Sequence, residues 1–306
     1  APMADGRTPV HIAAKMGEAD AIRALVELGA NVNTPSNTGR TPLYIAAQEG
    51  KVIAIQALAD LGGDVNAPMA DGRTPVHIAA KMGEADAIRA LVELGANVNT
   101  PSNTGRTPLY IAAQEGKVIA IQALADLGGD VNAPMADGRT PVHIAAKMGE
   151  VDAIRALVEL GANVNSPSNN SRTPLYIAAQ GGKVGVIQAL AELGGDVNTP
   201  SKDGRTPVYI AAQMGEVDAI RALVELGANV NTPSNTGRTP LYIAAQEGKV
   251  IAIQALADLG GDVNAPMADG RTPVHIAAKM GEADAIRALV ELGANVNTPS
   301  NTGRTP

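Results

Sequence analysis

Apolar residues fall into two short stripes of helical spacing within the first thirty positions of the chain. The first stripe follows Thr8 and Pro9, a pair typical of a helix start, because threonine caps the first turn and proline there loses no hydrogen bond. Gly17 should end this helix in a left-handed conformation. From about residue 18 to 28 apolar positions recur at i, i+3 and i+4, which predicts a second helix that Gly29 ends.

Polar residues cover the opposite side of the second predicted helix. Asp20, Arg23 and Glu27 lie there, and Arg23 and Glu27 form an i, i+4 pair, although in the less favourable order. Residues 31–33 should then extend, and a turn-rich loop leads to the next threonine-proline pair. A helix of about nine residues is marginal in water on its own, so both helices must pack on neighbours.

The same pattern returns every 33 residues. The seven residues that begin at Thr8, Thr-Pro-Val-His-Ile-Ala-Ala, recur with small changes up to Thr272, and Thr305 begins a further copy. A motif of this period identifies an array in which each repeat packs on its neighbours. We therefore expect one all-α array over residues 1–306, with repeats at about 1–33, 34–66, 67–99, 100–132, 133–165, 166–198, 199–231, 232–264 and 265–297, and the start of a tenth at 298–306.

The repeat resembles the ankyrin repeat family. Residues 5–14 read Asp-Gly-Arg-Thr-Pro-Val-His-Ile-Ala-Ala, which is similar to the family's Gly-x-Thr-Pro-Leu-His-x-Ala-Ala opening. Gly17, Leu25 and residues 29–33, Gly-Ala-Asn-Val-Asn, are similar to its closing part. The resemblance implies an elongated, curved solenoid of stacked antiparallel helix pairs with projecting hairpin-like loops. It also implies that loop tips and first helices line a concave side, where family members bind protein partners.

Odd and even repeats differ, so the true duplication is two repeats long. Residues 1–66 and 67–132 are identical. Except for the seventh, odd repeats have an Ala-Pro-Met-Ala-Asp-Gly loop and histidine as the second residue after the Thr-Pro start. Even repeats have tyrosine there, and most of them have a Thr-Pro-Ser-Asn-Thr-Gly loop. Because Pro35 and Pro68 cannot donate hydrogen bonds to a ladder, we expect stiff loops rather than two-stranded sheet.

Composition narrows the classes of partner. A formal charge of −7 and a pI near 5.2 argue against general affinity for nucleic acid or acidic membranes. No apolar run is long enough to span a bilayer. The absence of cysteine fits a reducing compartment, and a cytoplasmic location is favoured although an extracellular one is equally permitted by this count.

No residue pattern in the chain indicates catalysis. The histidines share one position of the repeat and lie two or more repeats apart, so they should not converge on a metal ion. Hydrogen bonding near the Thr-Pro turn is the favoured role of His11, because Tyr44 takes the same position in the next repeat. No nucleophile elbow, phosphate-binding loop or zinc-protease motif occurs. We expect no enzyme activity, no cofactor and no metal.

The favoured function is a scaffold that binds a protein partner. The structural motif consists of Thr8, Pro9, His11, Gly17 and Gly29. Candidate contact residues lie at the loop tips, with two more on the first helices: Met69, Ala70, Asp71, Ser102, Asn103, Met135 and Ala136, and Lys15 and Gln48. Exposed methionines suit adaptable contact surfaces, but each could instead pack on its adjacent loop. Arg7, Arg40 and Arg73 could reach an anionic partner or pair with neighbours such as Asp5.

A structural spacer or elastic rod is the alternative function. Neither end of the chain reads as a polar capping repeat, since Ile12 and Leu25 of the first repeat and Ile276 and Leu289 of the ninth resemble internal positions. Such ends could associate head to tail, and a contact of that kind propagates as a filament because it does not close.

The sixth repeat, about residues 169–201, should be the first to open. Gly185 lies inside its second helix, where glycine costs roughly 1 kcal/mol relative to alanine. Native-state hydrogen exchange should therefore show the fastest amide exchange in this repeat. Uniform protection along the array would contradict the prediction.

Overall fold

The computed structural model describes residues 3–306 and divides into two compact units, Ala1–Asn163 and Val164–Pro306. Unit 1 contains α1 (Pro9–Met16), α2 (Ala19–Glu27), α3 (Pro42–Gln48), α4 (Val52–Asp60), α5 (Pro75–Met82), α6 (Ala85–Glu93), α7 (Pro108–Gln114), α8 (Val118–Asp126), α9 (Pro141–Met148) and α10 (Val151–Glu159). Unit 2 contains α11 (Pro174–Gln180), α12 (Val184–Glu192), α13 (Pro207–Met214), α14 (Val217–Glu225), α15 (Pro240–Gln246), α16 (Val250–Asp258), α17 (Pro273–Met280) and α18 (Ala283–Glu291).

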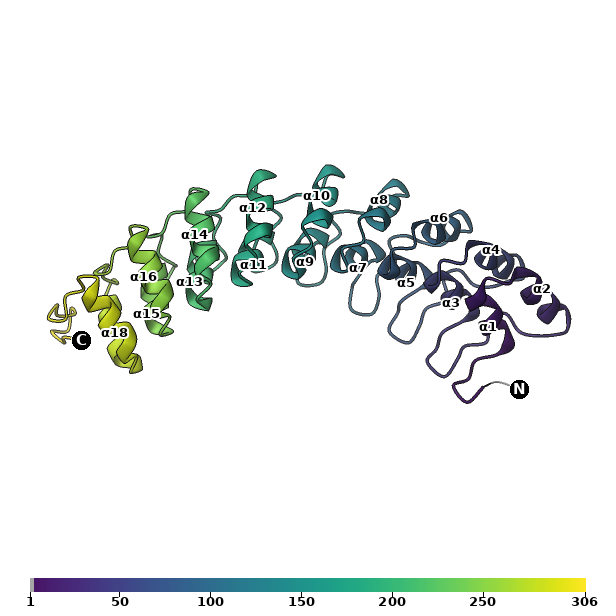
Figure 1. Ribbon diagram of the computed structural model, residues 1–306, viewed down its shortest axis with the longest axis horizontal. Coiled ribbons are helices and arrows are strands. Elements are labelled where there is room, and N and C mark those ends of the chain that lie inside the picture. The colour runs from purple at the N-terminus through teal and green to yellow at the C-terminus, as the bar shows by residue number, and fades with distance from the viewer. Residues whose placement is uncertain (1–2) are drawn as a thin grey trace. The chain divides into compact units, whose positions relative to one another are not determined.

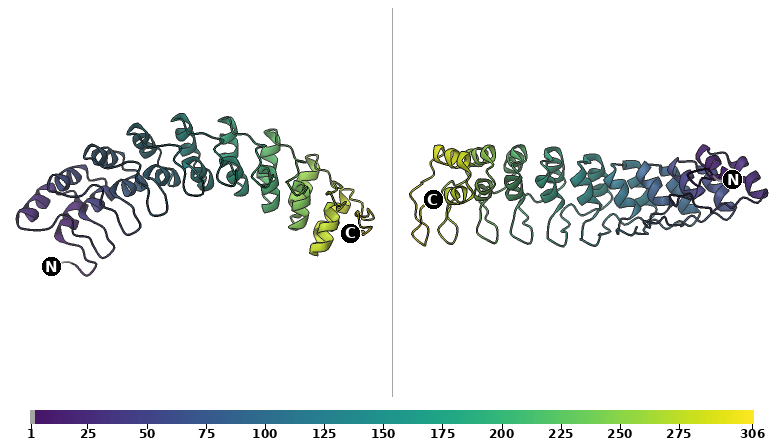
Figure 2. Two further views of the ribbon diagram at one scale, coloured as in Figure 1. Left: turned by 180° about the vertical axis from the view of Figure 1, so that it is seen from behind. Right: turned by 90° about the horizontal axis from the view of Figure 1, so that it is seen from below.

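Each repeat is a pair of antiparallel helices followed by a loop, so the predicted all-helical class is confirmed. Within unit 1 the first helices form one layer and the second helices another, and the loops project beyond the first layer (Figure 1; Figure 2). First helices pack on the first helices of adjacent repeats, as α3 does on α1 and α5, and second helices do the same. Unit 2 repeats this arrangement from α11 to α18.

The helices begin and end where the sequence predicts. The Thr41 hydroxyl accepts a hydrogen bond from the Tyr44 amide at 3.2 Å, and Pro42 occupies the first helical position. Gly17 ends α1 with φ of 85°, in the left-handed region that disfavours a side chain. In the repeats with histidine the cap is different, because the Thr8 hydroxyl lies 2.9 Å from His11 Nδ1.

The core consists of small and aliphatic side chains. Ala46, Ala47, Ile55 and Leu58 of the second repeat are completely buried. Alanine keeps the first helices close together, and the larger aliphatic residues fill the space between the two layers. This core explains how helices of seven to nine residues persist: α3 and α4, for example, are each covered on two sides by adjacent repeats and on a third by each other.

Asparagines at the ends of the second helices join consecutive repeats. The Asn33 side-chain amide donates to the Gly62 carbonyl at 2.8 Å, and its oxygen accepts from the Asp64 amide at 3.0 Å. Asn66 makes the same two bonds to the next repeat, to Gly95 and Asn97. Residues 31–33 were expected to form an extended segment that only connects the second helix to the loop. Asn33 instead belongs to a ladder of hydrogen bonds between repeats.

Two expectations about side chains were wrong. Arg23 pairs with Asp20 at 3.0 Å rather than with Glu27, which follows the arginine in the less favourable order for an i, i+4 pair. In the ninth repeat the exposed aliphatic residues are not Ile276 and Leu289, which are 5% and 0% exposed, but Val290 and Val296, which are 45% and 41% exposed. Ile12 in the first repeat is 40% exposed, as expected for an uncovered position.

The Leu25 position provides a matched test of stacking. Leu91, its equivalent in the third repeat, is completely buried, whereas Leu25 is half-buried. Leu91→Ala should therefore cost about 2–5 kcal/mol and Leu25→Ala about 1–2 kcal/mol, because Leu25 already contacts water. Urea unfolding of both variants measures the difference. Equal losses would mean that burial by adjacent repeats does not set the stability of this position.

Candidate interaction surface

The loops are closed by their own backbone hydrogen bonds. In the third repeat the Met69 amide donates to the Arg73 carbonyl at 2.8 Å, and the Gly72 amide donates to the Met69 carbonyl at 2.9 Å. Gly72 has φ of 78°, which this tight turn requires. No strand forms anywhere in residues 3–306, so the expectation that the loops form no two-stranded sheet is confirmed.

In the first four repeats each odd loop is also bonded to the even loop that follows it. The Asn103 amide donates to the Asp71 carbonyl at 2.9 Å, and the Asn103 side-chain amide donates to the Ala70 carbonyl at 3.0 Å. Asn37 makes the same pair of bonds to the first loop. These bonds fix the spacing of the two loop tips within each pair. Together with the first helices they form a surface that we call the loop face: the loops 3–7, 36–40, 69–73, 102–106 and 135–139 in unit 1.

The candidate contact residues differ in how far they reach solvent. The exposed ones are Ala70, Asp71, Asn103, Ala136 and Lys15, and the half-buried ones are Met69, Met135 and Gln48. Ser102 is only 6% exposed, and its hydroxyl accepts from the Arg106 amide at 3.2 Å. Ser102 therefore belongs to the framework of the loop. Sequence reasoning missed this because its position in the repeat looks like any other loop tip.

The histidines hold consecutive repeats together. His11 Nε2 lies 2.9 Å from the Arg40 carbonyl, which can only accept, so Nε2 carries the proton. Nδ1 then accepts from the Thr8 amide at 3.0 Å. His77 repeats the arrangement with Thr74 and Arg106. Both ring nitrogens are thus engaged, which leaves the ring no free position for proton transfer or metal ligation.

The odd-repeat arginines pair within their own loops. Arg7 lies 3.4 Å from Asp5, Arg73 lies 3.4 Å from Asp71, and Arg139 is 3.3 Å from Asp137. The expectation that these arginines pair with an aspartate two residues earlier is therefore confirmed. All three pairs are partly exposed and contribute little to stability at ordinary ionic strength.

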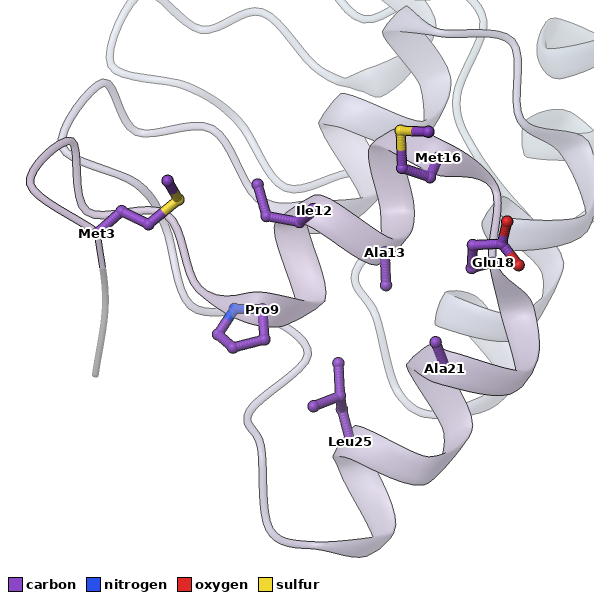
Figure 3. A pocket seen from close by; sticks show the side chains of 8 residues that line it. All are labelled: Met3, Pro9, Ile12, Ala13, Met16, Glu18, Ala21 and Leu25. Carbon is purple, nitrogen blue, oxygen red and sulfur yellow. The ribbon is translucent and has the colours of Figure 1, made fainter.

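An apolar pocket opens on the outer side of the first repeat (Figure 3). It is lined by Met3, Pro9, Ile12, Ala13, Met16, Glu18, Ala21 and Leu25. Ile12 is 40% exposed there, whereas the equivalent Ile78, on a helix that packs on α3, is 8% exposed. The pocket is thus a surface through which repeats stack on one another.

Nowhere in residues 3–306 do three histidine, aspartate or glutamate side chains gather as a metal ion would require. None of the helices in this part of the chain has both the length and the hydropathy for a bilayer crossing.

Comparison with known proteins identifies the family. The family model described as "Ankyrin repeats (3 copies)" matches residues 1–69, 54–135, 120–201, 193–267 and 252–306. The chain therefore belongs to the ankyrin repeat family, whose repeats are generally protein-interaction modules. It is similar to the human ASB11 ankyrin repeat domain, a crystal structure, with 29% identity and a TM-score of 0.63 over 73% of this chain and 99% of that one. A search of curated proteins finds no match.

Protonation of His11 and His77 should destabilise the array. Burial lowers the pKa of His77, although its hydrogen bond to the Arg106 carbonyl acts in the opposite direction. Because the folded pKa lies below the unfolded one, stability is fully present above about pH 6.5 and is lost as the pH falls below it.

The variant His77→Tyr isolates this effect, since Tyr209 occupies the same position in the seventh repeat. Urea midpoints at pH 7.5 and 5.5 should differ less for the variant than for the parent chain. An unchanged pH dependence would show that His77 does not carry it.

Proposed function

We propose that this chain is a non-catalytic scaffold that binds a protein partner through its loop face. The observation that carries the proposal is the repeated set of exposed tip residues, on loops that hydrogen bonds join in pairs. Asn103 donates hydrogen bonds to the backbone carbonyls of Ala70 and Asp71. The side chain of Asp71 pairs with Arg73, and Ala70 remains exposed. A rigid surface loses little conformational entropy when it binds.

Repetition determines the kind of partner that suits this surface. Loop tips of residues 3–7 and 69–73 have the same sequence, and neither contains an aromatic residue. Strong interfaces usually depend on a few tyrosine, tryptophan or arginine anchors at their centre. A surface that repeats small contacts every two repeats instead gains affinity from many weak contacts made together. We therefore expect an extended or repetitive partner.

End-to-end association is the weaker alternative. The open pocket of the first repeat favours it, but the other end of the array is already partly covered. The loop of residues 300–304 is held on the ninth repeat by the Asn301 amide, which donates to the Asp269 carbonyl at 2.9 Å, and by His275 Nε2, 3.1 Å from the Arg304 carbonyl. If a second copy stacked on the ninth repeat in register, its loop 3–7 would have to occupy the position that loop 300–304 already holds.

Bulky charged residues at two loop tips test the scaffold. The double variant Ala70→Arg and Ala136→Arg should lose at least about tenfold in affinity for any partner selected against the parent chain, for example from a displayed library of protein fragments. Its matched control is Gln56→Arg with Gln122→Arg, which adds the same charge to exposed positions of α4 and α8.

The control variant should bind as the parent chain does. If the selected partners bound both variants equally well, the loop face would not be the binding surface. If only the control variant lost binding, the second helices would be the binding surface.

A further inference from the structure

The second and fourth repeats each contain an arginine whose charge no carboxylate neutralises. Arg40 and Arg106 occupy the position that Arg7 and Arg73 occupy in odd repeats, but Thr38 and Thr104 replace the aspartate two residues earlier. Neither arginine forms an ion pair within residues 3–306, and the buried Nε of each donates to no group there. The desolvated donor is therefore left without an acceptor.

The backbone holds these arginines in place. The Arg40 amide donates to the Ser36 hydroxyl at 3.2 Å, and its carbonyl accepts from both the Ser36 amide at 2.9 Å and His11 Nε2 at 2.9 Å. Arg106 has the same contacts with Ser102 and His77. The arginines thus start from fixed points on the loop face, although they form no ion pair.

Each unpaired arginine belongs to a small cluster around a tyrosine. Burial raises the pKa of the Tyr44 hydroxyl, while the positive charges of Arg40 and Arg73 lower it and the negative charge of Asp71 raises it. All three charges thus act at one tyrosine. Two arginines and one aspartate leave a charge of about +1, in a protein whose net charge is −7.

The cluster recurs in both units. We call the four groups the arginine clusters: Arg40, Tyr44, Asp71 and Arg73; Arg106, Tyr110, Asp137 and Arg139; Arg172, Tyr176, Asp203 and Arg205; and Arg238, Tyr242, Asp269 and Arg271. In unit 2 the Arg172 guanidinium lies 5.5 Å from the centre of the Tyr176 ring. The clusters are 66 residues apart, so each recurs once per pair of repeats.

We propose that the arginine clusters bind the carboxylates of an extended acidic segment in the partner protein. The inference rests on the proposed scaffold function and adds the chemistry of its ligand. Planar guanidinium groups match carboxylates with two parallel hydrogen bonds, and such a group would supply the acceptor that the Arg40 and Arg106 Nε atoms lack.

Spacing defines the ligand further. Helices in contact are 8–10 Å apart, so clusters two repeats apart are separated by roughly 16–20 Å. An extended chain rises about 3.3 Å per residue, so the matching segment has an acidic side chain at about every sixth position. Nucleic acid also presents regularly spaced anions, but the net charge of −7 on the chain disfavours a polyanion of that charge density.

Two peptides of identical composition test the spacing. Both are labelled glycine-serine peptides with four glutamates, either at every sixth position or in one contiguous block. Fluorescence anisotropy on the full chain should show at least about fivefold tighter binding of the spaced peptide, weakening as salt rises from about 50 to 300 mM. Equal binding of the two peptides would overturn the proposal.

Two substitution pairs test the arginines. Arg40→Gln with Arg106→Gln should weaken binding of the spaced peptide about tenfold. Thr38→Asp with Thr104→Asp keeps both arginines but places a carboxylate where the odd repeats have one, and should weaken binding as much. Thr38 and Thr104 are exposed, so this pair leaves the core untouched. Normal binding by the aspartate variant would overturn the proposal.

The control pair is Lys51→Gln with Lys117→Gln, which removes the same charge before α4 and α8. It should bind the spaced peptide as the parent chain does. If it lost as much affinity as the Arg40→Gln and Arg106→Gln pair, the effect would be one of overall charge, and the proposal would be overturned. A single-stranded oligonucleotide serves as the second probe. If it bound with the same dependence on Arg40 and Arg106 and the peptide did not, the ligand class would be wrong.

The scaffold proposal is tested separately by the tip variants. If acidic peptides failed to bind while selected partners still depended on Ala70 and Ala136, the arginine-cluster proposal alone would fail. If acidic peptides bound and the tip variants had no effect on any partner, the clusters would stand and the wider loop face would not.

Discussion

Stacking between adjacent repeats is the interaction on which the rest of this structure depends. A helix of seven residues such as α3 has too few internal hydrogen bonds to persist in water. It persists because Ala46 and Ala47 are completely buried between neighbouring first helices, and Ile55 and Leu58 fill the space to the second layer. Every other feature follows from this packing, including loops that are held at a regular distance from one another.

Hydrogen bonds between repeats add direction to that packing. The histidines join first-helix starts to the next loop, and the asparagine ladder joins second-helix ends. Each bond contributes about 0.5–1.5 kcal/mol and has a fixed geometry, unlike the apolar contacts. The bonds therefore set the register in which repeats stack. That register places chemically equivalent side chains in rows along the loop face, where we propose that the partner binds.

The sequence predicts the fold well because helix starts and ends are local signals. Thr41 and Pro42 start α3 and Gly17 ends α1 without help from distant residues. Contacts between repeats are harder to predict, since Asn33 and His11 bond to residues 29 positions away. The burial of Ser102 was missed because its position in the repeat looks like any other loop tip.

Candidate site residues were predictable only as exposed positions in a period. The sequence shows that aspartate alternates with threonine before the loop arginines, but only the structure shows the consequence. Arg73 meets Asp71, whereas the Nε of Arg40 is buried without an acceptor. The residue two positions before the arginine, aspartate or threonine, thus decides whether the charge of that arginine is neutralised, as in Arg73, or not, as in Arg40.

Hydrogen exchange of the chain with and without a bound partner tests the central claim most directly. Our account predicts that binding slows amide exchange in the loops 36–40, 69–73 and 102–106 and leaves the exchange rates in α4 and α8 unchanged. Protection confined to the second helices, or to the apolar pocket at Ile12 and Leu25, would contradict it.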